Sequence, residues 1–188
     1  MLERVIPGTT LKFTEQAREE AFSMISPVLE ATGGLTLSQL SKLTGLEGTT
    51  IQNWIKRGWV SSTKGKKYSE KQVLRILLIN MFRGAMKLED IARLMGYVNG
   101  DVEDTSDDII EDICLYNMLC RIIFTAEDKG AFDTGSVKTL VEQEIAENTK
   151  MIADDEKLSG AMYVMVLAYR SGWLRAEMEK GLEKLIRP

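Results

Sequence analysis

The sequence contains no histidine among its 188 residues. Histidine is the commonest general base, the usual partner of a nucleophilic serine and a frequent zinc ligand. The two cysteines, Cys114 and Cys120, lie six residues apart on an expected helix. They therefore face different directions, and we expect two buried, reduced thiols. These absences predict that the protein is not an enzyme and that it holds no metal and no cofactor.

Long apolar runs are also missing. The strongest, Ile76 to Phe82, is interrupted by Asn80 and is far shorter than the roughly 20 residues that a membrane helix needs. The opening residues, MLERVIPGTT, lack the basic and apolar regions of a secretory signal. We therefore expect a cytoplasmic protein that does not enter a membrane.

Proline is scarce, with three in the chain, whereas 44% of the residues are hydrophobic and 28% are charged. This composition is typical of a folded protein rich in helix. A chain of this length buries roughly 70% of the surface that its unfolded form exposes, so it needs no disulfide or metal for stability. The expected fold class is mainly α, in one or two small domains.

Charge is unevenly distributed along the chain. Residues 35–97 contain eleven Lys and Arg against four Asp and Glu, a net charge of +7. Residues 98–188 contain ten against nineteen, a net charge of −9, and residues 1–34 contain three against five, a net charge of −2. A basic middle segment followed by an acidic one indicates that the middle segment meets a polyanion.

Residues 1–34 are expected to supply one docking helix. The stretch FTEQAREEAFSMISPVLEATGG starts at Thr14, a candidate N-cap, and ends at two glycines, with a disturbance near Pro27. One face of this helix would be apolar, through Ala17, Ala21, Phe22, Ile25 and Leu29. An isolated helix has nothing to bury that face against, so it must dock on the rest of the protein.

Two short periodic segments follow, within LTLSQLSKLTGLEGTTIQNWIKRGWV. The first starts after Thr36 and is stopped by Gly45. The second begins near Glu47 and has Gly58 at its C-cap. Two short helices joined by a tight turn that contains glycine form a helix-turn-helix.

The second of these helices has two chemically different sides. At about 100° per residue, Ile51, Trp54 and Ile55 turn inward. The opposite side offers hydrogen-bonding side chains without an acid, namely Thr49, Gln52, Asn53 and Lys56. Gln and Asn can bond adenine in a bidentate way, Lys can reach guanine, and Thr can contact thymine methyl groups. Most surface helices have a polar outer side, so this face alone does not indicate DNA binding. The segment that follows the helix helps to distinguish an ordinary surface helix from a DNA-binding one.

The loop SSTKGKK comes directly after Trp59 and Val60. Its three lysines, Lys64, Lys66 and Lys67, repel one another unless they spread into solvent or face phosphates. A small, basic loop centred on glycine has the size of a wing or hairpin tip. The helix-turn-helix and the wing together offer base contacts and backbone contacts from one rigid unit.

Beyond the wing the sequence predicts further helices. A capping box of Ser69 and Gln72 opens EKQVLRILLINMFRG, which is apolar nearly all round and is therefore expected to be buried on all sides. The next helix, KLEDIARLMGY, is expected to stop at Gly96. Residues 99–108, NGDVEDTSDD, are typical of an acidic linker.

Residues 109–188 predict a C-terminal helical domain. We expect three or four helices, roughly at 107–126, 137–151 and 156–170, with a last one that reaches Ile186 and can be continuous with its predecessor. The many Met and aromatic residues suit an adaptable core, a dimer interface or a pocket for a small-molecule effector. The sequence does not separate these alternatives.

The strings LSKLTGLEGTTIQNWIKRGWV and YSEKQVLRILLINMFRGAMKLEDIARLM, with the short wing, resemble the DNA-binding domain of the mercury-resistance regulator (MerR) superfamily. This resemblance covers about 60 residues and implies a MerR-like winged helix-turn-helix with a short wing hairpin. It places Thr49, Thr50, Gln52 and Asn53 at the major groove and the three loop lysines on the DNA backbone. The whole chain also resembles an uncharacterised family of Gram-positive bacterial proteins, a domain of unknown function, through stretches such as NWIKRGWV and ILLINM.

The sequence departs from the MerR pattern at three places. Asn53 stands where the superfamily often has an aromatic residue, so a base preference cannot be transferred. Lys87 occupies the usual serine cap before LEDI. The long dimerising helix expected after Met95 is replaced by the acidic stretch. If the protein dimerises, it therefore uses the C-terminal helices.

Together these features predict a sequence-specific, DNA-binding transcriptional regulator that binds double-stranded DNA as a homodimer. The alternative is a protein interaction module in which the same fold docks an acidic protein surface, its own acidic tail included. The predicted domains are 1–34, 35–98, 99–108 and 109–188. The predicted DNA-binding residues are Thr49, Thr50, Gln52, Asn53, Lys56, Arg57, Lys64, Lys66, Lys67 and Tyr68.

Overall fold

The computed structural model describes residues 4–63, 65–100, 104 and 106–186. Over these residues the chain forms eight α-helices and one two-stranded sheet, so the predicted mainly α fold class is confirmed. The helices are α1 (Ser26–Thr32), α2 (Leu37–Thr44), α3 (Gly48–Lys56), α4 (Glu70–Phe82), α5 (Leu88–Asn99), α6 (Asp112–Lys129), α7 (Thr134–Asn148) and α8 (Asp155–Ile186). The strands are β1 (Leu35–Thr36) and β2 (Lys67–Tyr68), and the 3-10 helices are η1 (Glu15–Ala17), η2 (Ala21–Met24) and η3 (Thr149–Met151).

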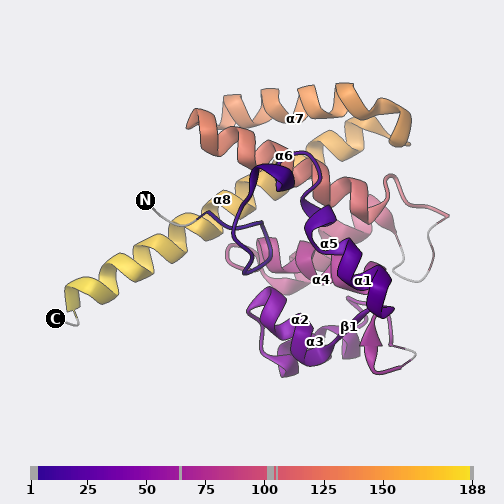
Figure 1. The fold of residues 1–188 in the computed structure, drawn as a ribbon. Coiled ribbons are helices and arrows are strands. Elements are labelled where there is room, and N and C mark those ends of the chain that lie inside the picture. The colour runs from indigo at the N-terminus through magenta and orange to yellow at the C-terminus, as the bar shows by residue number, and fades with distance from the viewer. Residues whose placement is uncertain (1–3, 64, 101–103, 105, 187–188) are drawn as a thin grey trace.

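The helices are arranged around α4. Figure 1 shows α6 and α7 at one end of the molecule, α2 and α3 with β1 at the other, and α4 and α5 between them. The long helix α8 packs on α4, α5, α6 and α7 and then extends beyond the body toward the C-terminus. None of the helices in the described ranges is both long and apolar enough to span a bilayer.

The predicted N-terminal docking helix is wrong in its form. Residues 15–32 make two 3-10 turns and the short helix α1 instead of one continuous helix. Glu20, with φ −135° and ψ 82°, is not helical and separates η1 from η2. Pro27 stands in the first turn of α1, where its missing N–H costs no hydrogen bond. The apolar face nevertheless docks as expected, because Ala17, Ala21 and Phe22 are fully buried.

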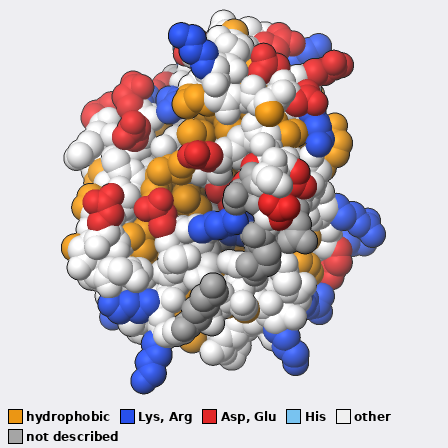
Figure 2. Space-filling model, turned by 90° about the vertical axis from the view of Figure 1, so that its right-hand side faces the viewer, with side chains coloured by type: hydrophobic (Ala, Val, Ile, Leu, Met, Phe, Trp, Pro, Cys, Tyr) orange, Lys and Arg blue, Asp and Glu red, His pale blue; other side chains and the backbone are white. Residues whose placement is uncertain are grey.

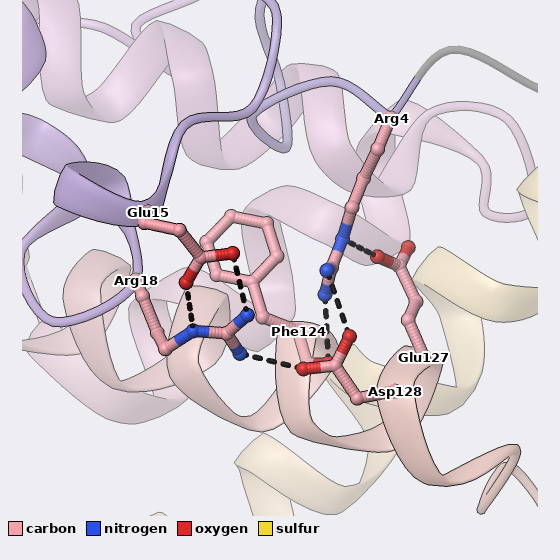
Figure 3. A network of polar contacts seen from close by, with 6 residues as sticks. All are labelled: Arg4, Glu15, Arg18, Phe124, Glu127 and Asp128. Carbon is pink, nitrogen blue, oxygen red and sulfur yellow. Dashed lines mark hydrogen bonds and ion pairs between the residues drawn. The ribbon is translucent and has the colours of Figure 1, made fainter.

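Two arginines fasten the N-terminal segment to the end of α6 (Figure 3). Arg4 binds the carboxylates of Glu127 and Asp128 and also donates to the Phe124 carbonyl oxygen at 2.7 Å. Arg18 binds Asp128 at 2.6 Å and Glu15 at 2.9 Å. The hydrogen bond from Arg18 lowers the pKa of Asp128, whereas burial raises the pKa of Glu127 despite its pairing with Arg4.

The same segment also holds the end of α2. The Asn80 side-chain amide on α4 donates to the carbonyl oxygens of Gly8, at 2.9 Å, and Thr44, at 3.0 Å. The Thr10 hydroxyl donates to the Lys42 carbonyl oxygen at 2.8 Å. Lys42 and Thr44 belong to the last turn of α2, where carbonyls have no partner inside the helix. Thr10 of the N-terminal segment thus satisfies the Lys42 carbonyl oxygen, and Asn80 on α4 satisfies that of Thr44.

The helices α2 and α3 form where the sequence predicted them. A capping box of Thr36 and Gln39 starts α2, and Gly45, in the left-handed conformation, ends it. After a three-residue turn, Glu47 is the N-cap of α3. These are local signals, which explains why the sequence shows them.

The two-stranded sheet differs from the expected wing hairpin. In the described residues, β2 pairs antiparallel with β1, with Leu35 opposite Tyr68 and Thr36 opposite Lys67. The sheet therefore joins the start of α2 to the start of α4 and does not form a hairpin within the loop. The close approach requires glycine at position 34, because a Cβ there would lie 2.5 Å from the Tyr68 carbonyl oxygen.

The helix α4 is buried nearly all round, as predicted, and starts at the Ser69–Gln72 capping box. Helix α5 does not stop at Gly96 as expected but continues to Asn99. The extra turn buries Val98 and places the Asn99 side-chain amide 2.8 Å from the Ile110 carbonyl oxygen. These contacts outweigh the helix-breaking tendency of Gly96. Asn99, the first residue of the predicted linker, is therefore helical, and residues 101–103 and 105 of that linker lie outside the described residues.

The C-terminal helices follow the prediction, and the last two are one continuous helix, α8. Most Met and aromatic residues of this part are core, including the fully buried Met118, Phe124, Met162 and Met165. Cys120 is buried and Cys114 half-buried, and both are free thiols. One hydrophobic cluster includes residues from α4, α5, α6 and α8, so the core runs across the predicted domain boundaries.

Candidate nucleic-acid interface

Helix α3 presents the polar face that the sequence predicted. Gln52, Asn53 and Lys56 are exposed, whereas Ile51 and Trp54 are almost completely buried. Thr49 is exposed and Thr50 is half-buried near the start of the helix. The structure therefore brings the predicted base-contacting side chains together on one accessible helix face.

The end of α3 is held by backbone contacts that fix this face. Gly58, with a φ of +74°, lets the chain leave the helix, and the Trp59 N–H donates to the Trp54 carbonyl oxygen at 3.0 Å. The Val60 side chain is then buried against the core. Because the side chains of Trp54 and Val60 are both buried in the core, the position of α3, and with it that of its outer face, is fixed relative to the rest of the protein.

Arg57 is exposed but already has partners. Its Nη1 atom lies 3.0 Å from the Glu89 carboxylate on α5, and its guanidinium lies 5.1 Å from the centre of the Trp59 ring. An exposed ion pair of this kind contributes little stability. Arg57 therefore remains available to an anion that competes with Glu89. The sequence did not reveal that Glu89 lies next to Arg57.

The segment after α3 is fixed at one point and exposed at its lysines. The Gln72 side-chain amide donates to the Ser61 carbonyl oxygen at 2.9 Å, which ties the segment to α4. Lys66 and Lys67 are exposed, and the Lys67 ammonium donates to the Thr32 carbonyl oxygen. Lys64 lies outside the described residues.

A hollow of about 560 Å³ lies beside this segment. Its lining residues are Gly33, Ser61, Ser62, Gly65, Lys66, Lys67, Ser69 and Gln72. The lining consists of hydroxyls, an amide and two ammonium groups, which are the donors that proteins use for phosphate oxygens. The serines were not among the predicted DNA-binding residues, although the string SSTKGKK contains two of them.

Tyr68 does not belong to this surface. Only 6% of the residue is exposed, and burial raises the pKa of its hydroxyl. Its backbone forms β2 and pairs with Leu35. The prediction that Tyr68 faces DNA is thus corrected: its side chain packs in the core and closes the base of the loop, as an aromatic residue at a strand end often does.

The charges seen on the surface follow the distribution along the sequence. Figure 2 shows Lys and Arg side chains protruding at the lower end of the molecule, where Figure 1 places α2, α3 and β1. Most of the visible Asp and Glu side chains lie higher on the same face. The outer face of α3 is not covered by the acidic C-terminal segment, since its polar side chains are exposed.

Residues 28–119 match the family model described as a domain of unknown function (DUF1836). The chain is also similar to the uncharacterized protein YkrK of Bacillus subtilis (strain 168), with 32% identity over 115 residues. That alignment covers 59% of this chain and 48% of YkrK, so the chain spans about half the length of that relative. No solved structure matches the chain. Over the matched residues these findings support the predicted resemblance to an uncharacterised Gram-positive family, which was expected for the whole chain. The resemblance to the MerR superfamily stays a prediction.

Proposed function

We propose that the protein is a sequence-specific DNA-binding transcriptional regulator that acts as a homodimer. Helices α2 and α3 serve as the helix-turn-helix, and the segment after α3 serves as the wing. In this proposal Gln52 and Asn53 contact base edges in the major groove, and Lys66 and Lys67 contact phosphates.

The observation that carries the proposal is the pairing of two surfaces at one end of the molecule. The exposed face of α3 offers amide, hydroxyl and ammonium groups without a carboxylate. The adjoining hollow offers lysines and serines, again without a carboxylate among its lining residues. Base contacts need the first kind of surface, and phosphate contacts need the second.

A single module of this size makes few phosphate contacts, so its binding is weak and strongly dependent on salt. A symmetric dimer corrects this by placing two modules about 34 Å apart, or at a multiple of that spacing, on an inverted repeat. Dimerisation therefore belongs to the proposed function and needs a second surface.

The distal part of α8 supplies that second surface. Helix α8 leaves the body where Gly172 passes Gly84, so closely that a Cβ on Gly172 would lie 3.3 Å from the Gly84 carbonyl carbon. Beyond this crossing the helix bears exposed apolar side chains, namely Leu174, Met178, Leu182, Leu185 and Ile186. At about 100° per residue the first four fall within an arc of about 80°. A stripe of this kind is typical of a helix that packs against another helix.

The direct test is selection of bound duplexes from a random DNA pool by the full chain. The proposal predicts enrichment of an inverted repeat. A pool whose composition is unchanged after repeated rounds would contradict it. If the chain instead binds poly-glutamate and leaves duplex DNA unbound, the alternative of an acidic protein partner is favoured.

A further inference from the structure

The side chain of Arg75 is buried without a full set of partners. Arg75 lies on α4, and its side chain is 6% exposed. Among the residues that the structure describes, its Nη1 atom has no hydrogen-bond partner, and Oδ1 of Asp112 lies 3.6 Å from it. That oxygen already accepts a hydrogen bond from the Asn99 amide at 3.0 Å. A buried guanidinium that is incompletely bonded is costly, so a residue of this kind calls for an additional anionic partner.

Arg75 lines a hollow of about 410 Å³ that lies between the end of α3, the chain that follows it, α4 and α5. The remaining lining residues are Ile55, Gly58, Trp59, Val60, Ser61, Ser62, Ile79, Ala92, Met95, Gly96 and Gly100. Arg75 is the one charged residue among the described residues of this lining. Most other lining groups are apolar, apart from the two serines and backbone atoms.

The volume of the hollow lies in the range of small-molecule sites, which are mostly apolar with a few polar groups that fix the orientation of the ligand. A guanidinium binds carboxylates well because its planar N–H groups match the two carboxylate oxygens. The aliphatic and aromatic lining, which includes Ile79 and Trp59, suits an apolar body attached to that carboxylate.

Two acidic residues compete with such a ligand for Arg75. Asp112 at the start of α6 has a carboxylate oxygen 3.6 Å from Nη1, and Asp108 interacts with Arg75 at longer range. Burial raises the pKa of Asp108, which weakens its competition for Arg75. Neither residue lines the hollow. Arg75 does line it, so a ligand in the hollow can reach the Arg75 side chain.

We infer that this hollow binds a small organic anion, a carboxylate with an apolar chain or ring, whose carboxylate pairs with Arg75. The sequence predicted a possible effector site in the C-terminal domain, whereas this hollow lies directly behind α3. Its walls include Ile55 on α3 and Ser61 and Ser62, which also line the hollow beside the wing. A bound ligand would fix the position of the wing segment relative to α4 and α5. The effect on DNA binding rests on the proposed function, but ligand binding itself does not.

The test titrates the full chain with octanoate, benzoate and, as a neutral match for octanoate, 1-octanol, using isothermal titration calorimetry. Tryptophan fluorescence supplies a second signal because Trp59 lines the hollow. We expect saturable binding of at least one of the two carboxylates, and octanoate to bind at least tenfold more tightly than 1-octanol. Absence of saturable binding for both carboxylates would overturn the inference.

Two variants locate the site. Arg75→Met removes the charge and keeps much of the side-chain volume, so the advantage of octanoate over 1-octanol should disappear. Gly96→Leu retains Arg75 and fills the hollow from α5, where a Cβ meets no atom within 4 Å. Leu is also the better helix former, so folding is not threatened. Unchanged carboxylate affinity in a folded Gly96→Leu chain would contradict the assignment.

The regulatory step has a separate readout. If the site controls the wing, a saturating carboxylate should change the affinity of the chain for its selected duplex by at least threefold. This change should be absent in Gly96→Leu. Carboxylate binding without any change in DNA affinity would refute the regulatory step alone. Carboxylate binding by a chain that selects no DNA would support the site while contradicting the proposed function.

Discussion

The outer face of α3 and the distal part of α8 are both exposed helical surfaces, but their chemistry differs. The α3 face offers Gln52, Asn53 and Lys56 above a buried Ile51 and Trp54. The distal α8 stripe exposes leucine, methionine and isoleucine side chains. Exposure alone therefore does not identify a partner. The polar face suits groups that accept and donate hydrogen bonds, whereas the apolar stripe gains free energy only by leaving water.

The two surfaces also differ in their support. Helix α3 is short, and its inner side is built into the core together with α2 and α4. The distal part of α8 extends past the point where Gly172 meets Gly84. A rigid base suits recognition of fixed base edges, and a projecting apolar helix suits pairing with an equivalent helix. The predictions below separate these two roles.

The largest effect is expected from charges placed in the α8 stripe. The double substitution Met178→Glu and Leu182→Glu should give a monomer, and it should weaken binding to an inverted repeat by on the order of 100-fold, because two linked modules bind far more tightly than one. Sedimentation measures the mass, and fluorescence anisotropy measures the DNA affinity.

The control for this substitution has the same change in charge on the other side of α8. Ala176→Glu with Lys180→Gln adds one negative charge and removes one positive charge, so the net charge also falls by two, but the stripe stays intact. This control should remain dimeric. Equal loss of dimer in both variants would show that charge, and not the apolar stripe, is responsible.

The next effect concerns the wing. Lys66→Ala with Lys67→Ala should weaken binding to all duplexes by roughly 10- to 100-fold at 0.1 M salt, and it should make the slope of log affinity against log salt shallower by about 2. Anisotropy at several salt concentrations measures both. The matched control, Lys129→Ala with Lys138→Ala on α6 and α7, should leave the slope unchanged.

A single base contact should have a more selective effect. Gln52→Ala should lower affinity for the selected duplex by about 1–3 kcal/mol and leave affinity for random duplexes almost unchanged. Competition binding against duplexes altered at one position measures this preference. Equal losses on selected and random DNA would exclude Gln52 from base recognition. The α3 face would then affect DNA binding in the same way as the wing lysines.

The smallest effect is expected at the ion pair that holds Arg57. Glu89→Gln should free the guanidinium for phosphate and tighten binding by a few-fold at most, because exposed ion pairs contribute about 0.2–1 kcal/mol. Anisotropy at low salt gives the most sensitive measurement. Weaker binding by Glu89→Gln would show that the pair positions Arg57 for DNA and does not withhold it.

The sequence predicted those parts of the fold that depend on local signals. The capping boxes of Thr36 with Gln39 and of Ser69 with Gln72 both form, and the inward positions of Ile51 and Trp54 are confirmed. Helical periodicity and caps act within a few residues, so one sequence displays them directly.

Features that depend on tertiary contacts were missed. Helix α5 passes Gly96 because Asn99 finds a partner at Ile110, and the expected N-terminal helix is interrupted at Glu20, close to Arg18, which binds Asp128 on α6. In the candidate site, Tyr68 follows a polar, basic stretch that is typical of a surface loop, but its backbone pairs with a strand distant in the sequence. Nothing in the sequence marked Arg75 as a candidate binding residue, because its burial depends on the helices that pack around α4.

The central claim is recognition of a DNA sequence, and the relative affinity of the full chain for selected and scrambled duplexes tests it most directly. Measured by anisotropy near 0.15 M salt, the selected duplex should bind about 1,000-fold more tightly than the scrambled one. Both affinities should fall steeply as salt rises. Equal affinities for the two duplexes, or no binding to either at about 100 µM protein, would contradict the account.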